Sequence, residues 1–438
     1  MKKIYVIIAL IIVVLMMGCN DKNNEKDVHQ EVASTTNDST ELEEALILKV
    51  EYPESVAFDD YDSKRLVFTE NVIDDEYGGM LANFSYESAS RILYKSDENK
   101  CYSPISLYMA LSLLASGASE ESEEEMLTLL GIPNKEKLAE ENAKIFRRLY
   151  KDNKIEKLKI VNSLWMSDES LFHDDFINNA KENYYASLFS VDFNEKITND
   201  LMSTWVYDNT NEIISPKITT NPDQVMAVLN TLYFKNEWSD KFNKDANTIS
   251  EFYLTDGKEV ECEYMNITYD AREFIRGDNF TSASLNLKGG SRMMFVLPDK
   301  EVSVDELVSS PKLFASMLTK KSDNYGKVIF QVPKFSYDDN SKMKDMLIDM
   351  GMKSPFEFGS QFKDISNGIT FISNISQDTH ISIDENGVEA AAFTQIDLAG
   401  AMPPTENIAE MILDRPFIYV VYDRGVILFT GIVNNPSK

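Results

Sequence analysis

Residues 225–235 constrain the fold most, because their sequence, VMAVLNTLYFK, is apolar on both faces of a pleated strand. Successive side chains of a strand point to opposite faces of its sheet. Here Met226 and Val228 fall on one face, and Ala227 and Leu229 fall on the other. The segment therefore predicts the central strand of a large sheet that is covered on both sides.

Helices are predicted mainly in the first half of the chain and strands mainly in the second. Ser103 suits a helix N-cap and Pro104 the first helical position, so a buried helix is expected to Gly117. Further helices are expected over residues 81–94 and from the acidic run 119–125. Further strands are predicted at residues 291–297, 327–332, 379–384, 417–422 and 426–432. This order predicts the α+β class.

The composition predicts a globular protein without a nucleic-acid partner. The chain has 438 residues, 43% of them hydrophobic, and a formal net charge of −29. Proteins bind phosphate backbones through Lys and Arg, so this charge argues against DNA or RNA. Composition does not change abruptly beyond residue 77, and we therefore expect a single domain over residues 77–438 and a monomer.

The N-terminus carries a targeting pattern. Two lysines precede an apolar run over residues 4–17, which is too short for a permanent membrane span and leads to Cys19. Residues 1–18 resemble a bacterial lipoprotein signal. Cleavage before Cys19 would leave a lipid on its thiol and anchor the protein to a membrane outside the cytoplasm, at the cell surface. Simple secretion is the alternative.

Two segments separate this signal from the domain. Residues 19–44 are polar and predict a disordered tether, whereas residues 45–76 contain aromatic residues and predict an extension whose packing the sequence does not specify. Within the domain only Cys101 and Cys262 occur. A disulfide between them stays open, but a large core needs no such bridge, and we expect two free, buried thiols.

A low-charge segment near the C-terminus has the pattern of a strand held outside a sheet. Residues 384–404 read DENGVEAAAFTQIDLAGAMPP and begin with an acidic turn that contains Gly387. With a period of two, the face that starts at Val388 is uncharged, whereas Glu389 and Asp397 fall on the other face. One face could therefore enter a sheet without burying a charge. A mobile surface loop is the alternative.

Short motifs in a fixed order give the chain a family resemblance. They are YSPIS at residues 102–106, NTLYFKNEW at 230–238, LPD at 297–299, VPKF at 332–335, LIDMGMKSPF at 347–356, RPF at 415–417 and FTG at 429–431. Together with the segment 385–394 they resemble the serpins over about 360 residues. The resemblance implies the serpin fold, which is α+β with three β-sheets, about eight to nine helices and an exposed reactive-centre loop.

The resemblance also implies a mechanism. In inhibitory serpins a serine or cysteine endopeptidase attacks the loop and forms an acyl-enzyme, and the loop then inserts as a new strand and traps the protease. The hinge that starts insertion comprises Glu385, Gly387, Val388, Glu389, Ala390, Ala391, Ala392 and Thr394. Its inserting face is uncharged, which favours an inhibitor over a non-inhibitory serpin-fold protein that binds or scaffolds at a surface.

The implied reactive bond lies fourteen residues after Gly387, between Ala401 and Met402. Counting back from Pro416 would instead give a bond near Glu406. Small apolar residues precede the bond, and neither Lys nor Arg occurs between the hinge and the bond. Such a loop suits elastase-like or subtilisin-like serine proteases or papain-like cysteine proteases, and it disfavours a trypsin-like target.

Two residue groups carry further expectations. The first resembles the serpin shutter, a polar cluster beneath the sheet opening, and consists of Ser103, Ser106, Asn230 and Gln377. Ordinary cap and strand roles are its alternative, and Gln377 replaces a frequent family His, which predicts a shutter without pH sensitivity.

The second group shares one face at helical spacing and consists of Lys144, Arg147, Arg148 and Lys151. A solvated face is expected there, with a polyanion site as the alternative.

No enzyme, metal or cofactor pattern is recognised. The sequence lacks the nucleophile-elbow, zinc-protease, phosphate-loop and dinucleotide motifs. It contains only three histidines, namely His29, His173 and His380. We therefore expect an inhibitor rather than an enzyme, with neither a metal nor a cofactor.

Overall fold

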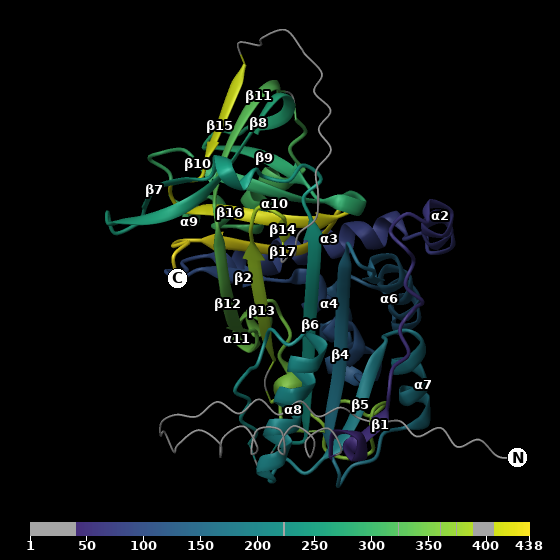
Figure 1. Ribbon diagram of the computed structural model, residues 1–438. Coiled ribbons are helices and arrows are strands. Elements are labelled where there is room, and N and C mark those ends of the chain that lie inside the picture. The colour runs from purple at the N-terminus through teal and green to yellow at the C-terminus, as the bar shows by residue number, and fades with distance from the viewer. Residues whose placement is uncertain (1–40, 222–223, 323, 360, 374, 389–406) are drawn as a thin grey trace, which may run out of the picture.

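The structure is a computed structural model that describes residues 41–438 except 222–223, 323, 360, 374 and 389–406 (Figure 1). Its first β-sheet has eight strands. Their order is β1 (Leu46–Leu48), β5 (Ala186–Val191), β4 (Lys157–Ser167), β6 (Met226–Glu237), β14 (Gly387–Val388), β13 (Ser376–Ile383) and β12 (Phe335–Lys342), with β3 (Lys151–Asp152) paired to β4.

Strand β6 lies inside this sheet and is covered on both faces, which confirms the prediction for VMAVLNTLYFK. On one face Met226 joins the main core, together with helix α4 (Pro104–Gly117). On the other face Ala227 joins a second apolar cluster that contains Trp205 of helix α8 (Lys196–Asn209). Because both faces are buried, the strand has no alternation of apolar and polar residues.

The second sheet has nine strands. Their order is β15 (Ile408–Ile412), β11 (Asn324–Pro333), β8 (Glu259–Arg276), β9 (Phe280–Asn286), β10 (Ser291–Pro298), β16 (Phe417–Asp423), β17 (Val426–Val433) and β2 (Lys100–Tyr102), with β7 (Thr248–Tyr253) paired to β8. The long strand β8 pairs with β7 and β11 along most of its length and with β9 only at Ile275 and Arg276. Three separate sheets were expected, and two of them are joined here through β8 into one continuous sheet.

The described helices include the buried one predicted after Ser103. Their bounds are α2 (Tyr61–Glu70), α3 (Asp75–Leu93), α4, α5 (Glu120–Leu130), α6 (Lys135–Leu149), α7 (Asp174–Glu182), α8, α9 (Val304–Val308), α10 (Pro311–Thr319) and α11 (Lys344–Asp349), with short 3₁₀ turns at Lys244–Ala246, Lys288–Gly290 and Ser354–Phe356. The hydroxyl of Ser103 caps α4 by accepting from the N–H of Ser106 at 3.3 Å, and every residue of α4 is buried. None of the described helices has the length and hydropathy needed to cross a membrane.

The N-terminal extension, residues 45–76, packs along one side of the first sheet and of α6. Strand β1 adds to the edge strand β5. The ring of Tyr52 then stacks on those of Phe146 and Tyr150, with centroids 6.3 and 5.5 Å away. Helix α2 closes the extension, where Nζ of Lys64 lies 2.9 Å from Oε1 of Glu156. The extension is therefore an integral part of the folded body.

Candidate functional site

Strand β14 marks the place where the chain after β13 enters the first sheet. Gly387 pairs with Glu237 of β6, and Val388 pairs with Asn236 of β6 and with Ile383 of β13. The described part of the strand, Gly387–Val388, is antiparallel to both neighbours. From β14 toward Met226 of β6 and Ser376 of β13, no ladder among the described residues joins β6 to β13. We call the facing edges of β6 and β13 in this region the insertion site.

Close contacts hold the chain at the top of the insertion site. A Cβ on Gly387 would lie 2.1 Å from the carbonyl oxygen of Asn236, so only glycine permits this approach. Oδ1 of Asp384 accepts from the N–H groups of Asn386 at 2.7 Å and of Gly387 at 3.2 Å, which forms the predicted acidic turn. Val388 follows with its side chain buried at 3% exposure. The last described residue before position 389 thus carries a buried apolar side chain.

A buried acid supports this turn. Glu385 is 8% exposed, and its carboxylate accepts from Nζ of Lys334 at 3.1 Å and from Nδ2 of Asn247. Burial raises the pKa of Glu385, but hydrogen bonds from its own backbone, Asn247 and Lys334 outweigh burial and place it below the usual value. Nε1 of Trp238 fixes the adjacent backbone by donating to the oxygen of Asp384 at 2.8 Å. Glu385 is therefore ionised and paired at neutral pH.

The four predicted shutter residues come together beneath the insertion site. On the β13 side, Oε1 of Gln377 accepts from the N–H of Ser103 at 2.8 Å, and its Nε2 donates to the oxygen of Ser103 at 3.0 Å. On the β6 side, the hydroxyl of Ser106 donates to Oδ1 of Asn230. All four residues are buried. The start of α4 therefore contacts both edges of the insertion site.

Asn162 of β4 is a further member of this cluster that the sequence analysis missed. Nδ2 of Asn230 donates to Oδ1 of Asn162 at 2.7 Å, and the two residues are register partners. Nδ2 of Asn162 has no hydrogen-bond partner among the described groups. A lone Asn in the apolar run LKIVNSLWM was the available signal, because a buried polar side chain needs a partner.

Several predicted residues lie outside the described part of the chain. These are the later hinge residues and both residues of the reactive bond, Glu389, Ala390, Ala391, Ala392, Thr394, Ala401 and Met402, and the lipidation residue Cys19. Of the predicted hinge, the structure describes Glu385, Gly387 and Val388. The roles of these residues in loop insertion, in the reactive bond and in lipid attachment stay predictions.

The prediction that these four cations form one solvated face is wrong. Helix α6 ends at Leu149, so Lys151 lies in β3, where it is 9% exposed and pairs with Asp423. Within α6, Nζ of Lys144 lies 3.0 Å from Oε1 of Glu141, whose side chain is fully buried. These two cations are therefore paired within the fold.

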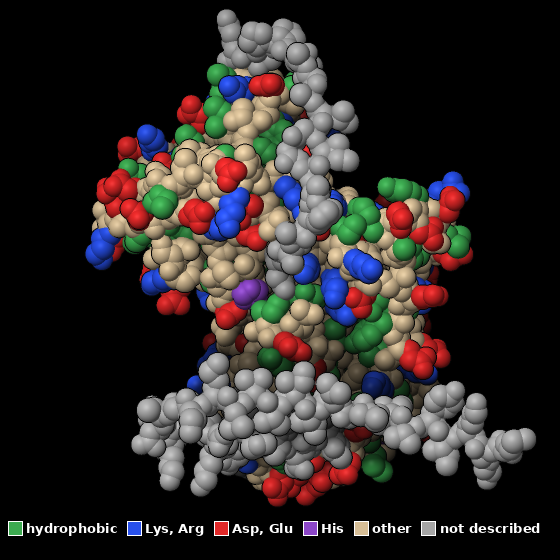
Figure 2. Space-filling view, in the orientation of Figure 1, with side chains coloured by type: hydrophobic (Ala, Val, Ile, Leu, Met, Phe, Trp, Pro, Cys, Tyr) green, Lys and Arg blue, Asp and Glu red, His purple; other side chains and the backbone are tan. Residues whose placement is uncertain are grey.

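The two arginines of this group also make contacts within the fold. Nε of Arg147 donates to the hydroxyl of Tyr185 at 2.8 Å, and the guanidinium of Arg148 lies 4.9 Å from the ring centre of Phe68 in α2. On the visible face of the molecule, Lys and Arg are interspersed with Asp and Glu (Figure 2). The arrangement does not favour a polyanion site, because these cations anchor neighbouring segments of the fold.

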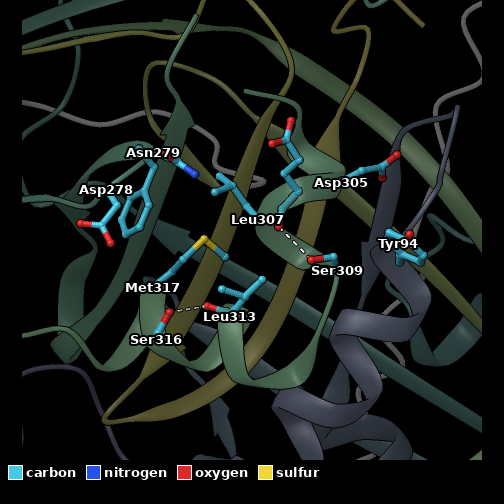
Figure 3. A pocket seen from close by; sticks show the side chains of 11 residues that line it. Tyr94, Asp278, Asn279, Asp305, Leu307, Ser309, Leu313, Ser316 and Met317 are labelled. Carbon is cyan, nitrogen blue, oxygen red and sulfur yellow. Dashed lines mark hydrogen bonds between the residues drawn. The ribbon is translucent and has the colours of Figure 1, made fainter. Parts of the chain in front are cut away.

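Cys101 and Cys262 are free and buried, as expected, and burial raises the pKa of the Cys101 thiol to about 12. Within the described ranges no cluster of His, Cys, Asp and Glu could hold a metal ion. A cavity of about 430 Å³ has apolar walls from Leu307 and Met317 and contains none of the predicted site residues (Figure 3).

Comparison with known proteins identifies the fold family. The family model described as Serpin (serine protease inhibitor) matches residues 80–436. This chain belongs to the serpin family. Serpin-Z10 of Arabidopsis thaliana is 30% identical over 365 residues, covering 78% of this chain and 92% of that protein. An uncharacterised serpin-like protein of Methanosarcina acetivorans is 29% identical, covering 83% of this chain and 87% of its own length.

Solved serpin structures share the architecture. The native state of the thermophilic serpin tengpin has a TM-score of 0.74 at 25% identity and covers 89% of this serpin and 97% of its own chain. Serpin48 of the insect Tenebrio molitor, described as highly specific, has a TM-score of 0.75 at 26% identity and covers 83% of this serpin and 99% of its own chain. The overall architecture is therefore shared with these solved serpins.

Proposed function

We propose that this serpin is a suicide-type inhibitor of serine or cysteine endopeptidases. Its reactive loop is cleaved, inserts between β6 and β13, and traps the protease as a covalent acyl-enzyme. The observation that carries this proposal is β14, in which Gly387 pairs with β6 and Val388 pairs with both β6 and β13. Apart from β14, no ladder among the described residues joins β6 to β13, so the facing edges of these strands offer hydrogen-bonding groups to a further strand.

The free energy available from insertion is large enough to distort a bound protease. An inserted strand that forms about ten ladder hydrogen bonds at roughly 0.5 to 1.5 kcal/mol each gains on the order of 10 kcal/mol, before apolar burial. This gain is comparable with the stability of an ordinary domain. The shutter cluster favours the same function, because its hydrogen bonds hold β6 and β13 separately, each against α4.

The sequence of the loop suggests the target class. With the bond between Ala401 and Met402, the protease must accept a small apolar residue in its specificity pocket. Elastase-like and subtilisin-like serine proteases and papain-like cysteine proteases fit this requirement. The alternative function is a non-inhibitory serpin that binds or scaffolds at a surface, and a charged side chain at Val388 would have favoured it.

A protease panel tests the proposal. The protein is incubated with subtilisin, elastase and papain, and the products are separated on a denaturing gel. A covalent complex with at least one enzyme is expected, and mass spectrometry of the released C-terminal peptide identifies the cleaved bond. Cleavage by every enzyme without any complex would establish the non-inhibitory alternative. Trypsin serves as the control enzyme, for which neither rapid cleavage of the loop nor a complex is expected.

We further propose that the mature protein is a monomeric lipoprotein outside the cytoplasm, anchored through Cys19. Support comes from the lysine-led apolar run that ends at Gly18 and Cys19. Detergent-phase partition of the wild-type protein and of Cys19→Ala tests the anchor. Loss of membrane association in the variant is expected, whereas partition of both proteins into the aqueous phase would favour simple secretion.

A further inference from the structure

The N-terminal segment and the reactive loop join the first sheet at opposite ends. Leu46 of β1 pairs with Phe189 of β5, Phe189 pairs with Trp165 of β4, and Trp165 pairs with Ala227 of β6. The loop, in contrast, leaves the sheet beside Asn236. In Figure 1, β1 accordingly lies at the lower end of the molecule and β14 near the middle, at the upper end of β6.

The register gives the separation between these two points. From Ala227 to Asn236 β6 advances nine residues, which corresponds to about 30 Å at roughly 3.3 Å per residue. The chain from Cys19 therefore reaches the folded body about 30 Å from the place where the reactive loop leaves the sheet. We call the end of the sheet that contains β1 and Ala227 the β1 pole.

The same register predicts where an inserted loop would end. Val388 pairs with Asn236 in an antiparallel ladder, so each later loop residue lies opposite an earlier residue of β6. Ala401 follows Val388 by thirteen residues, and thirteen residues before Asn236 is position 223, three before Met226 at the start of β6. An acyl bond at Ala401 would therefore arrive at the β1 pole.

From this geometry we propose that the segment between Cys19 and the folded body is a spacer whose length decides whether the anchored serpin can trap a protease. The inference rests on the proposed inhibition and lipid anchor. Trapping carries the protease to the pole from which this segment leaves. In an anchored molecule the protease must then fit between the folded body and the membrane.

The dimensions make the length of the spacer consequential. A protease of about 240 residues has a radius of gyration near 18 Å and thus a diameter of about 45 Å. The 22 residue steps from Cys19 to Glu41, the first described residue, reach at most about 75 Å. When stretched, the natural segment can therefore span the protease, whereas half of it, about 38 Å, cannot do so even when fully extended. A moderate deletion thus removes the only arrangement in which the segment spans a trapped protease.

Four proteins separate the effect of length from the effects of inhibition and anchoring. They are the full-length protein and a deletion of residues 25–35, each with Cys19 and with Cys19→Ala, expressed in a host that attaches lipid to such cysteines. Each is incubated with subtilisin or whichever enzyme of the panel gives a complex. The covalent complex and the cleaved serpin are then quantified on a denaturing gel.

For the anchored pair, we expect the deletion to lower the ratio of complex to cleaved serpin at least fivefold. For the Cys19→Ala pair we expect equal ratios. Replacing residues 25–35 by eleven Gly and Ser residues should restore trapping in the anchored protein. Equal ratios in the anchored pair would overturn the proposal, as would failure of the Gly and Ser segment to restore trapping. Absence of complex in all four proteins would contradict inhibition itself, and membrane retention of Cys19→Ala would contradict the anchor.

Discussion

The side chain of Gln377 forms two hydrogen bonds with the backbone of Ser103, accepting from its N–H at 2.8 Å and donating to its oxygen at 3.0 Å. Both residues are buried. The amide matches one donor and one acceptor of the peptide group at the same time, which a neutral imidazole can also do but an imidazolium cannot. Strand β13 is thus held to α4 by a contact that does not titrate.

We predict that Gln377→His makes stability depend on pH. In the folded protein the imidazole must accept from the N–H of Ser103, so its pKa falls below the unfolded value of about 6.5. The unfolded chain then binds more protons as the pH falls, and the free energy of unfolding decreases by up to about 1.4 kcal/mol per pH unit below 6.5. Urea unfolding at pH 8, 6 and 5 measures this. A slope equal to that of the wild-type protein would contradict the predicted contact.

A second prediction concerns Glu385 and Lys334 at the top of the insertion site. Glu385→Gln should lower the free energy of unfolding at pH 7 by about 1.5 to 3 kcal/mol, because a charge-assisted hydrogen bond is lost. The pKa of Glu385 is lowered in the fold, so its stabilisation is complete above the unfolded value of 4.5 and disappears as the pH falls through the folded value. The stabilities of the two proteins, as measured by urea unfolding, should therefore converge as the pH falls below the folded pKa of Glu385. Glu263→Gln is the control and should have a smaller effect, since that side chain is 43% exposed.

A third prediction tests insertion. Val388→Arg places a charge where the side chain is 3% exposed, and burial of an unpaired charge is costly enough to expel β14. The variant should behave as a substrate, with at least a tenfold lower ratio of covalent complex to cleaved serpin on a denaturing gel. Val388→Thr has a similar shape and should keep most of the complex. An unchanged ratio in Val388→Arg would show that this position does not enter the sheet.

A fourth prediction concerns the N-terminal extension. Tyr52→Ala removes a half-buried ring stacked on Phe146 and Tyr150 and should lower the free energy of unfolding by about 1 to 3 kcal/mol, less than the loss of a fully buried aromatic ring. Tyr61→Ala is the control, because that side chain is 74% exposed, and should change it by less than about 0.5 kcal/mol. Urea unfolding compares the variants. Equal, small effects would mean that the extension does not contribute to the stability of the body.

Local sequence signals predicted several of the helices and strands. The double-faced apolar pattern predicted β6, the Ser103 and Pro104 pair predicted the start of α4, and the turn before Val426 predicted the β16–β17 hairpin. In each case the information lies within a few neighbouring residues, because capping, turn chemistry and side-chain periodicity are local.

The failures all involve partners distant in sequence. Strand β1 has three residues and pairs with β5 about 140 residues later, so no local period could place it. Lys151 continues the helical spacing, but the chain leaves the helix at Tyr150, which has an extended backbone. Asn162 was recognisable as polar in an apolar run, yet only the register of β4 with β6 brings it to Asn230.

The pairing of α6 cations within the fold has a kinetic consequence. Lys137 and Lys144 both contact the buried Glu141, so they do not form a separate cationic patch, and the net charge of −29, in which they are already counted, sets the sign of the field around the molecule. The outward field of the molecule is then negative over about 8 Å at physiological ionic strength. Proteases with basic surfaces are steered toward it and acidic ones are slowed, and added salt reduces the difference. Among enzymes that could cleave the same bond, the speed of encounter would therefore select the partner.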